Sequence, residues 1–501
     1  MRIVRPGDPG YVEDCKISNF RFQYRPVEID YCANAGDVAA AIAKAKDKKW
    51  KVRIRAGGHQ HEGMCIANDV LLIDISEING FDYRVPGYAG YVWVGAGASL
   101  KSIYANLWMN GSLFSGGGCG DVHVGGLTQG GGWGPASRKL GLTCDSLFAV
   151  EYVAADGTSG IVRQDGPSWQ KELLWALRGG GGGNFGVVTK YCFQLHPWAG
   201  KYTDFTLGWA GGQFWDDRLH NFVRHWINTF PGDTNENLTT FLRVAAVDPD
   251  GDRAVIGGRY LGPKDEARQV VGQMLLGVPG WRTEQFTESP DRESMVTPEG
   301  ELIDPSQLAA LERHLGTLPG YQPGPVRAAT ESESALLGAP GIDLSDTCAI
   351  GASIRHKVSS GFARLDFGDA AIQTLTRYVT ETKILPEARQ YVSFHSFGGA
   401  VKKFGPQSSF AFRDRNFLLQ YQAWWQPEAS RIDCDCIKWI ENLRTTMTPY
   451  TDGAFINFAD RDIPLADYYG KSFTDLKRIK HERDPGDFFR FEMGIPGGLT
   501  E

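Results

Sequence analysis

The first 200 residues combine helical spacing, short strand-like runs and Gly-rich turns. Asp37 opens an Ala-rich stretch with helical spacing. Ser99 stands where the N-cap of a helix over Leu100–Leu107 is expected, because its hydroxyl can accept a backbone N–H. Strand-like runs occur at Val52–Arg55, Val70–Ile75, Tyr91–Val94 and Phe148–Ala155, and the last continues through Asp156-Gly157 to Ile161-Val162 as in a hairpin. This mixture predicts an α+β region.

The pattern changes from about Lys201, where Trp and Phe become frequent and Gly-rich loops fade. Arg253–Gly258 is strand-like. Helical spacing occurs at Lys264–Leu275, Pro305–Leu315, Asp369–Thr382 and Ser430–Met447, with Asp304-Pro305 as a helix start. Strands and helices in this arrangement predict a sheet covered by helices on one side. We expect the last segment, Phe455–Pro496, to rejoin the first lobe.

Composition narrows the class of protein. A chain of 501 residues exceeds the size at which one core keeps growing, so two lobes are expected. A net charge of -7 argues against a nucleic-acid or anionic-membrane partner. The start lacks a signal-peptide pattern and no stretch is long enough to span a bilayer, so we expect a cytoplasmic protein unless a leader was removed. The nine cysteines lack metal-ligand spacing, so no metal is predicted.

Three Gly-rich segments carry the candidate chemistry. The first, Arg55–Gly63 (RAGGHQHEG), follows a strand-like run. Its glycines would let backbone N–H groups approach a pyrophosphate, with Arg55 supplying positive charge. Its spacing matches neither of the common phosphate-binding motifs, and an ordinary tight turn is the alternative.

The second segment, Gly116–Gly134, surrounds Cys119 with glycine, and the third, Trp175–Thr189, contains a run of five glycines. Glycine in such density is costly in conformational entropy, so we expect a bulky flat group against this backbone. A cysteine in such a loop is a candidate nucleophile or attachment point.

Taken in order, these segments resemble the flavin domain of the vanillyl-alcohol oxidase superfamily, and specifically the berberine-bridge-enzyme-like oxidases. The matching motifs are the Arg-x-Gly-Gly-His turn, the cysteine followed by Gly-Gly six residues later, Arg138–Leu142, the Trp-Ala-Leu-Arg glycine run, Asn457, Tyr468–Gly470 and Asp484–Phe489. The resemblance implies a two-lobe α+β fold with an antiparallel-sheet substrate domain inserted at 201–449. The FAD-binding domain would span 1–200 and be completed by 450–501.

The resemblance also implies FAD attached through two covalent bonds, one to His59 and one to Cys119. His61 is the competing histidine, but only His59 directly follows Gly-Gly. The residues that we expect to contact the cofactor, besides His59 and Cys119, are Arg55, Ala56, Gly57, Gly58, Gln60, Gly63, Gly118, Val122, Gly125, Gly126, Gly130, Asn184, Gly186, Val188 and Asn457.

Three positions bear on the reaction. Val122 matches a family position where valine is associated with space for oxygen beside the flavin, which favours an oxidase; plain packing is the alternative. Trp133 and Phe455 occupy positions where many alcohol-oxidising relatives carry tyrosines, one of them the usual base. Because both phenols are missing, the proton that accompanies hydride transfer must go elsewhere.

The replacement base is sought on the strands that the family places over the flavin. On a strand, alternate residues share a face, so Ser393 would point with His395, and Leu418 with Gln420. A histidine has an ordinary pKa of about 6.5, which suits a general base, whereas an amide can only orient or bind. We therefore predict catalytic roles for His395, Gln420 and, as a second candidate base, His123; a buried structural histidine is the alternative for His395. Trp133, Ser393, Leu418 and Phe455 are predicted to line the substrate pocket.

The predicted function is that of an FAD-dependent oxidase. It would remove a hydride from an alcohol-type or amine-type carbon of a bulky substrate in specialised metabolism and reduce oxygen to hydrogen peroxide. Carbohydrate oxidation is the alternative, followed by a flavin-binding protein with lost or dehydrogenase-only activity. Its partners would be a small-molecule substrate and molecular oxygen, with no nucleic acid or membrane, in a monomer or homodimer.

Overall fold

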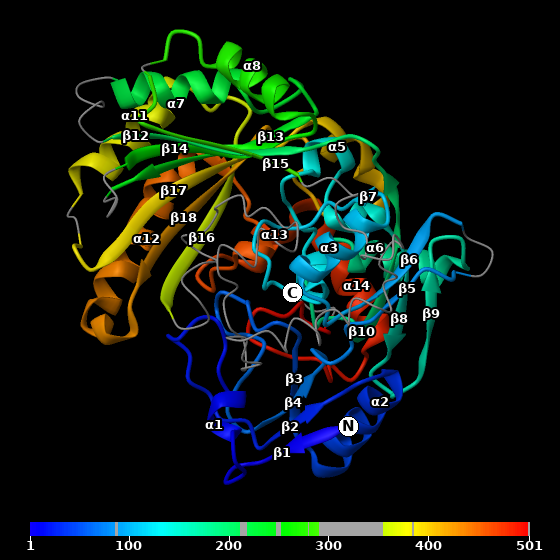
Figure 1. Ribbon diagram of the computed structural model, residues 1–501. Coiled ribbons are helices and arrows are strands. Elements are labelled where there is room, and N and C mark those ends of the chain that lie inside the picture. Colours follow the sequence, from blue (N-terminus) through cyan, green and yellow to red (C-terminus); the bar gives the residue numbers. More distant parts are fainter. Residues whose placement is uncertain are drawn as a thin grey trace, which may run out of the picture.

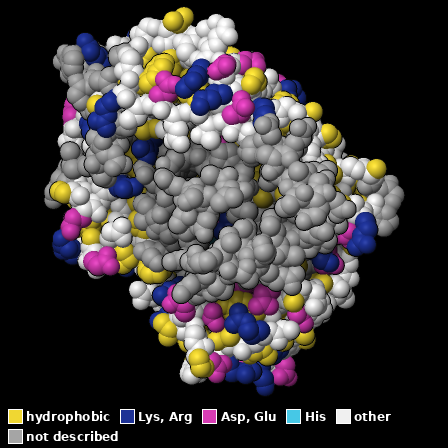
Figure 2. Space-filling view, viewed as in Figure 1, with side chains coloured by type: hydrophobic (Ala, Val, Ile, Leu, Met, Phe, Trp, Pro, Cys, Tyr) yellow, Lys and Arg dark blue, Asp and Glu magenta, His cyan; other side chains and the backbone are white. Residues whose placement is uncertain are grey.

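Two lobes with separate hydrophobic cores make up this computed structural model, which describes residues 1–85, 89–210, 218–246, 252–278, 280–289, 354–382 and 385–498. Figure 1 shows the first lobe, with the N-terminus, below an eight-stranded sheet and its helices. The predicted helix at Pro305–Leu315 lies outside the described residues. No helix among the described residues is long and apolar enough to cross a bilayer. On the face drawn in Figure 2, acidic and basic side chains of the described residues are interspersed.

The first lobe contains two main sheets. One has the order β1-β2-β4-β3 and is formed by β1 (Arg2–Val4), β2 (Glu28–Tyr31), β3 (Lys51–Arg55) and β4 (Val70–Asp74). The other has the order β5-β6-β10-β8-β9 and is formed by β5 (Phe81–Asp82), β6 (Tyr91–Gly95), β8 (Leu147–Val153), β9 (Ser159–Arg163) and β10 (Val187–Gln194). The predicted hairpin is present, since β8 pairs with β9 in antiparallel register.

Helices fill the space around these sheets. They are α2 (Ala35–Lys48), α3 (Leu100–Met109), α4 (Val124–Gln129) and α6 (Ser168–Leu177). Ser99 caps α3 as predicted, since its hydroxyl accepts the N–H of Ser102 at 3.4 Å. The predicted start of the Ala-rich helix at Asp37 is late by two residues, because the Asn34 side chain already caps α2.

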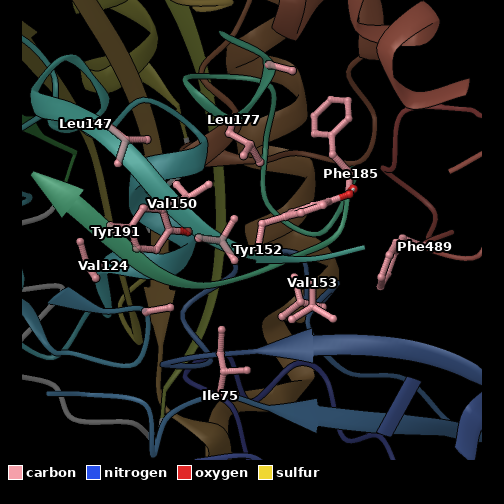
Figure 3. Close-up of a cluster of buried hydrophobic side chains, with 14 of the residues drawn as sticks. Ile75, Val124, Leu147, Val150, Tyr152, Val153, Leu177, Phe185, Tyr191 and Phe489 are labelled. Carbon is pink, nitrogen blue, oxygen red and sulfur yellow. The ribbon is translucent and has the colours of Figure 1, made fainter. Parts of the chain in front are cut away.

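The C-terminal segment shares the core of the first lobe. Its helices α13 (Leu465–Tyr469) and α14 (Phe473–Arg483) contribute Tyr469, Leu476 and Ile479 to the cluster that holds Val150 and Phe185. Figure 3 shows part of this core, including Phe489 beyond α14. The ranges 1–200, 201–449 and 450–501 remain our proposed division of the chain.

The second lobe is an antiparallel sheet of order β15-β12-β14-β13-β17-β18-β16-β19. Its strands are β12 (Thr203–Ala210), β13 (Leu238–Ala245), β14 (Asp252–Tyr260), β15 (Thr283–Glu288), β16 (Arg355–Ala363), β17 (Ala388–Ser396), β18 (Phe417–Trp425) and β19 (Thr451–Asp452). Helices α7 (Arg218–Thr229), α8 (Lys264–Met274), α11 (Asp369–Glu381) and α12 (Asp433–Met447) bury their apolar sides on one face, as predicted. The other face is turned toward the first lobe.

Candidate active site

A cavity of about 370 Å³ lies between the first lobe and the uncovered face of the sheet. The first lobe contributes residues within 52–65, 117–129 and 181–184, which lie on β3, on α4 and on the loops beside them. The C-terminal segment contributes residues within 455–458 and 489–493. The sheet contributes Phe241 and Arg243 from β13, His356 from β16, Tyr391, Ser393 and His395 from β17, and Gln420, Gln422 and Trp424 from β18. Residues far apart in the sequence therefore meet around one space.

Most residues that the sequence singled out line this cavity. They are His59, Cys119, Ala56, Gly57, Gly58, Gln60, Gly118, Val122, Gly125, Gly126, Asn184, Asn457, His123, His395, Gln420, Trp133, Ser393 and Phe455. Six others do not line it, namely Arg55, Gly63, Gly130, Gly186, Val188 and Leu418.

Three of these six residues are in contact with other groups of the protein. The Arg55 guanidinium pairs with the buried Asp74 carboxylate at 2.5 Å, so its charge is neutralised before it could reach a phosphate. A Cβ at Gly63 would lie 2.7 Å from the ring of Phe22, and one at Gly130 would overlap Asn457 Oδ1. Protein groups therefore occupy the Cβ side of both glycines, and their contact with a cofactor stays a prediction.

The other three are packed inside the lobes. Gly186 lies against the ring of Tyr152, and Val188 is buried in β10. Leu418 shares the cavity face of β18 with Gln420, as predicted, but is buried against Phe362 and Phe397. Leu418 is therefore behind the cavity wall rather than on it.

The two candidate attachment residues share the cavity with Asp121. Burial lowers the pKa of His59, partly offset by the Asp121 carboxylate, so the imidazole is neutral and nucleophilic at neutral pH. The loop that carries Cys119 is fixed by a turn, in which Val122 N–H donates to the Cys119 carbonyl at 3.2 Å, and by Leu100 N–H donating to the Val122 carbonyl at 2.9 Å. Cys119 is disulfide-bonded in this structure, and a sulfur bond to a flavin requires its reduction.

The cavity has the features that a flat cofactor requires. Hypothetical Cβ atoms at Gly126 and Gly182 would meet no neighbour closer than 3.8 Å, so these glycines border open space. Several buried polar atoms on the lining have no hydrogen-bond partner among the described residues, namely His123 Nδ1, Gln129 Oε1, His356 Nδ1, His395 Nδ1 and Tyr469 Oη. Buried polar groups are normally satisfied, so these atoms point to a polar ligand or to water.

His395 and Gln420 form a pair on the sheet wall. His395 Nε2 lies 2.9 Å from Gln420 Oε1, and the ring of Trp133 packs edge-on against His395 at 4.6 Å between centroids. An amide oxygen only accepts, so Nε2 carries the proton and Nδ1 keeps a lone pair. Burial lowers the pKa of His395 to about 4, with the Gln420 bond acting in the opposite direction, so the ring is neutral at pH 7.

Trp133 and Phe455 have no free polar group in the cavity. The indole N–H of Trp133 donates to the Ser396 carbonyl at 2.9 Å, and the ring of Phe455 packs edge-on against Phe458. Neither can exchange a proton with a substrate, as the sequence indicated.

A second side-chain pair on the cavity, formed by His61 and His356, was not predicted from the sequence. His61 Nδ1 lies 2.9 Å from His356 Nε2, and the His356 ring stacks on Trp424 at 4.2 Å between centroids. Asn19 holds both backbones, donating to the carbonyls of His61 at 2.7 Å and of His356 at 3.0 Å. Burial lowers the pKa of His61 to about 4 and that of His356 well below 6.5, so a neutral pair joins the two lobes at the cavity.

Two further cavity residues could have been predicted from the alternation of side chains along a strand. Extending the two-residue period beyond Gln420 gives Gln422 and Trp424, and both lie on the cavity. Gln422 on β18 links two side chains of β17, because its amide donates to Ser393 Oγ at 3.0 Å and accepts from the Tyr391 hydroxyl at 3.2 Å. Arg243 lies on a strand that we did not predict.

Comparison with protein families gives two matches. Residues 27–160 match the FAD binding domain, and residues 454–496 match the family described as berberine and berberine like. The first match contains His59 and Cys119, and the second contains Phe455 and Asn457.

Full-length relatives extend these matches. The uncharacterized FAD-linked oxidoreductase YgaK of Bacillus subtilis is 28% identical over 99% of this chain and 96% of its own length. Berberine bridge enzyme-like 21 of Arabidopsis thaliana is 25% identical over 93% of this chain and 82% of its own length.

Solved structures share the fold. Physcomitrella patens BBE-like 1 is 23% identical with a TM-score of 0.77, covering 99% of this chain and 97% of its own. Aclacinomycin oxidoreductase is 23% identical with a TM-score of 0.78, covering 99% of each chain. Glucooligosaccharide oxidase from Acremonium strictum, solved in work on its 6-S-cysteinyl, 8α-N1-histidyl FAD, is 18% identical with a TM-score of 0.78, covering 100% of this chain and 98% of its own. The chain is thus an FAD-dependent oxidoreductase that is similar to the berberine-bridge-enzyme-like proteins.

Proposed function

We propose that this chain is an oxidase that takes a hydride from an alcohol-type or amine-type carbon of a bulky substrate and passes the electrons to oxygen. The observation that carries the proposal is the His395–Gln420 pair facing the same cavity as His59 and Cys119. When bound, FAD would accept the hydride and reduce oxygen to hydrogen peroxide. The protein must bind the substrate and accept its proton.

His395 is the proposed proton acceptor. Gln420 holds the proton on Nε2, which leaves the Nδ1 lone pair to take the O–H or N–H proton of the substrate as the carbon loses its hydride. The packing of Trp133 against the ring fixes its orientation. His123 is the second candidate; its Nδ1 is also without a partner among the described residues, and burial lowers its pKa to about 4.

We propose two covalent bonds to FAD, from His59 and from Cys119 in its reduced form. Their positions on one cavity and the matching family segment support this arrangement. Intact mass spectrometry of the denatured protein tests it. Wild-type protein and each single variant, His59→Ala or Cys119→Ala, should keep the mass of FAD, whereas the double variant should lose it. Loss of all flavin from wild type on denaturation would rule out both bonds.

Oxygen as the acceptor is supported by Val122, which lines the cavity beside Cys119. The test is to reduce the holoenzyme anaerobically and then mix it with oxygenated buffer. Rapid reoxidation with one hydrogen peroxide per flavin is expected. Slow reoxidation would instead indicate a dehydrogenase.

A role in specialised metabolism is our first choice of substrate class, because Trp133 and Phe455 give the cavity apolar surfaces where many alcohol-oxidising relatives place phenols. Carbohydrate oxidation is the second candidate, favoured by the Tyr391 and Trp424 rings beside the Gln420 and Gln422 amides. A peroxide screen of polyketides, amines and oligosaccharides distinguishes the two.

A further inference from the structure

The sheet wall of the cavity carries a hydrogen-bond network centred on Gln422 of β18. The Trp424 indole N–H donates to Gln422 Oε1 at 3.1 Å, and the Tyr391 hydroxyl donates to the same oxygen at 3.2 Å. An indole nitrogen can only donate, so the atom that it faces is the amide oxygen and not the amide nitrogen. The orientation of the Gln422 amide is therefore fixed, with Nε2 turned toward Ser393.

This orientation decides the role of the Ser393 hydroxyl. Gln422 Nε2 lies 3.0 Å from Ser393 Oγ, and an amide nitrogen can only donate, so Oγ accepts this hydrogen bond. The hydroxyl's own proton finds no acceptor among the described residues, although Ser393 is only 6% exposed and lines the cavity. A buried donor is thus left without a partner in the protein.

The neighbours of Ser393 on the adjoining strands do not take this proton. Ser393 pairs with Gln420 on β18 and with Arg243 on β13. The Gln420 carbonyl oxygen is bonded to His395 Nε2 at 2.9 Å and not to Ser393, and a guanidinium can only donate. The hydroxyl proton therefore faces the cavity, where a ligand or water must accept it.

This donor stands beside the proposed proton acceptor. Ser393 and His395 are two residues apart on β17 and share its cavity face, so their Cα atoms are about 6–7 Å apart. His395 Nδ1 offers a lone pair, whereas Ser393 offers a proton. A ligand that satisfies both presents an O–H or N–H group to His395 and, a few bonds away, an acceptor oxygen to Ser393.

We propose that Ser393 is a specificity-determining residue that donates a hydrogen bond to a carbonyl or ether oxygen of the substrate while the reacting alcohol or amine contacts His395. The inference rests on the proposed function in that it takes this cavity as the substrate site. It narrows the substrate class to alcohols or amines that carry a second oxygen near the reacting carbon. A hydrocarbon edge or an N–H group at Ser393 is disfavoured, because the buried hydroxyl proton would then have no acceptor.

The test is a binding titration of the holoenzyme, followed by the change in flavin absorbance, with three bicyclic probes of similar size. 1-Indanone carries an acceptor, indole carries a donor and indane carries neither. In Ser393→Ala the affinity for 1-indanone should fall about three- to tenfold, whereas the affinities for indole and indane should stay within about twofold of wild type.

Four results would overturn the proposal. They are equal losses for all three probes, a loss for indole alone, an unchanged affinity for 1-indanone, and no binding of 1-indanone to wild type at millimolar concentrations. An unchanged affinity would mean that water, and not the ligand, accepts the Ser393 proton.

Further variants locate the effect. Ser393→Thr keeps the hydroxyl and should retain most of the affinity for 1-indanone, and a loss as large as in Ser393→Ala would contradict the assignment. Alanine also removes the acceptor of Gln422 Nε2, so thermal melting checks the fold. If alanine unfolds the protein, Ser393→Cys, a weak donor that still accepts weakly, should give the same selective loss. The exposed Ser430→Ala is the control and should behave as wild type.

Binding and turnover are separate measurements. Slow flavin reoxidation with an intact, Ser393-dependent affinity for 1-indanone would remove the oxidase proposal and leave the role of Ser393 in place. Fast reoxidation without that dependence would do the opposite.

Discussion

Because His395 is hydrogen-bonded to Gln420, substituting Gln420 should change the pKa of His395. Replacing Gln420 with glutamate places a carboxylate at nearly the same distance, which favours the charged imidazolium. We expect the pKa of His395 to rise above about 4 in Gln420→Glu. NMR titration of the His395 ring measures it, with Gln420→Ala as the control. An unchanged pKa in the glutamate variant would show that the two side chains are not coupled.

Individual site residues were predictable where a local motif marks them. His59 and Cys119 stand in glycine-rich loops, and His395 and Gln420 were predicted from the alternation of side chains on strands that the family resemblance places over the flavin. His356 and Arg243 could not be found in this way, because a cavity position on a strand depends on register and on which face is covered. Those properties are set by contacts between β16, β13 and their neighbours, not by the local sequence.

Gly126, inside α4, and Gly130, directly after that helix, are expected to respond differently to alanine. At Gly130 the added methyl would overlap Asn457 Oδ1, whose side chain also donates to the Leu127 carbonyl at 3.0 Å. Gly130→Ala should lower the free energy of unfolding by about 1–3 kcal/mol. Gly126→Ala, inside α4 and facing open space, should leave stability unchanged or raise it by up to about 1 kcal/mol, but reduce flavin content.

Chemical unfolding of the two proteins, with absorbance for flavin content, checks this pair. The reverse order of stabilities would mean that Gly130 has room and Gly126 does not.

Elements with strong local signals were predicted closely. The helix at Asp369–Thr382 and the strand at Arg253–Gly258 differ from α11 and β14 by three residues or fewer at either end. The predicted helix at Ser430–Met447 begins late, at Asp433, because residues Pro427–Ile432 form a 3₁₀ turn. Helix ends depend on caps and turns that compete with the apolar pattern.

At the scale of the whole molecule, the buried Lys357 links the two lobes through ion pairs. Lys357 on β16 lies 2.8 Å from Glu62 of the first lobe and 2.6 Å from Asp460 of the C-terminal segment. Burial works against its charge, but the two carboxylates outweigh it and raise the pKa of Lys357. Lys357→Met would remove the buried cation and leave Glu62 and Asp460 only their more exposed partners, Arg461 at 2.8 Å and Arg444 at 3.3 Å. The substitution should therefore destabilise the protein by up to about 3–5 kcal/mol.

Chemical unfolding tests this link, with the exposed Lys403→Met as the control. The control pair with Glu236 should be worth at most about 1 kcal/mol. Similar losses in both variants would show that the buried cluster adds no stability beyond that of a surface pair.

Lowering the pH should reduce the free energy of unfolding, because the histidines of the cavity are buried in their neutral form. Burial lowers the pKa values of His61, His123 and His395 to about 4, while unfolded histidine titrates at about 6.5. Between these values the unfolded chain binds more protons, so stability falls as the pH drops from about 6.5 to 4. The loss should reach roughly 3 kcal/mol per histidine, measured by chemical denaturation from pH 7.5 to 4. His395→Gln should flatten the dependence, and an unchanged slope would contradict the assignment.

The overall class was predictable because the two halves of the chain have different periodicities and because 501 residues exceed one core. How the lobes meet was not predictable, because Lys357, Glu62 and Asp460 are far apart in the sequence and carry no common motif.

Side chains along β13, β17 and β18 point alternately to the cavity and to the helices that cover the other face of the sheet. Residues 243, 391, 393, 420, 422 and 424 point to the cavity, while their neighbours in the chain are packed under the helices. Randomising these six codons would vary the cavity surface and leave the helix-facing packing in place. The sheet is therefore a natural starting point for directed evolution of new catalysts from this flavoprotein.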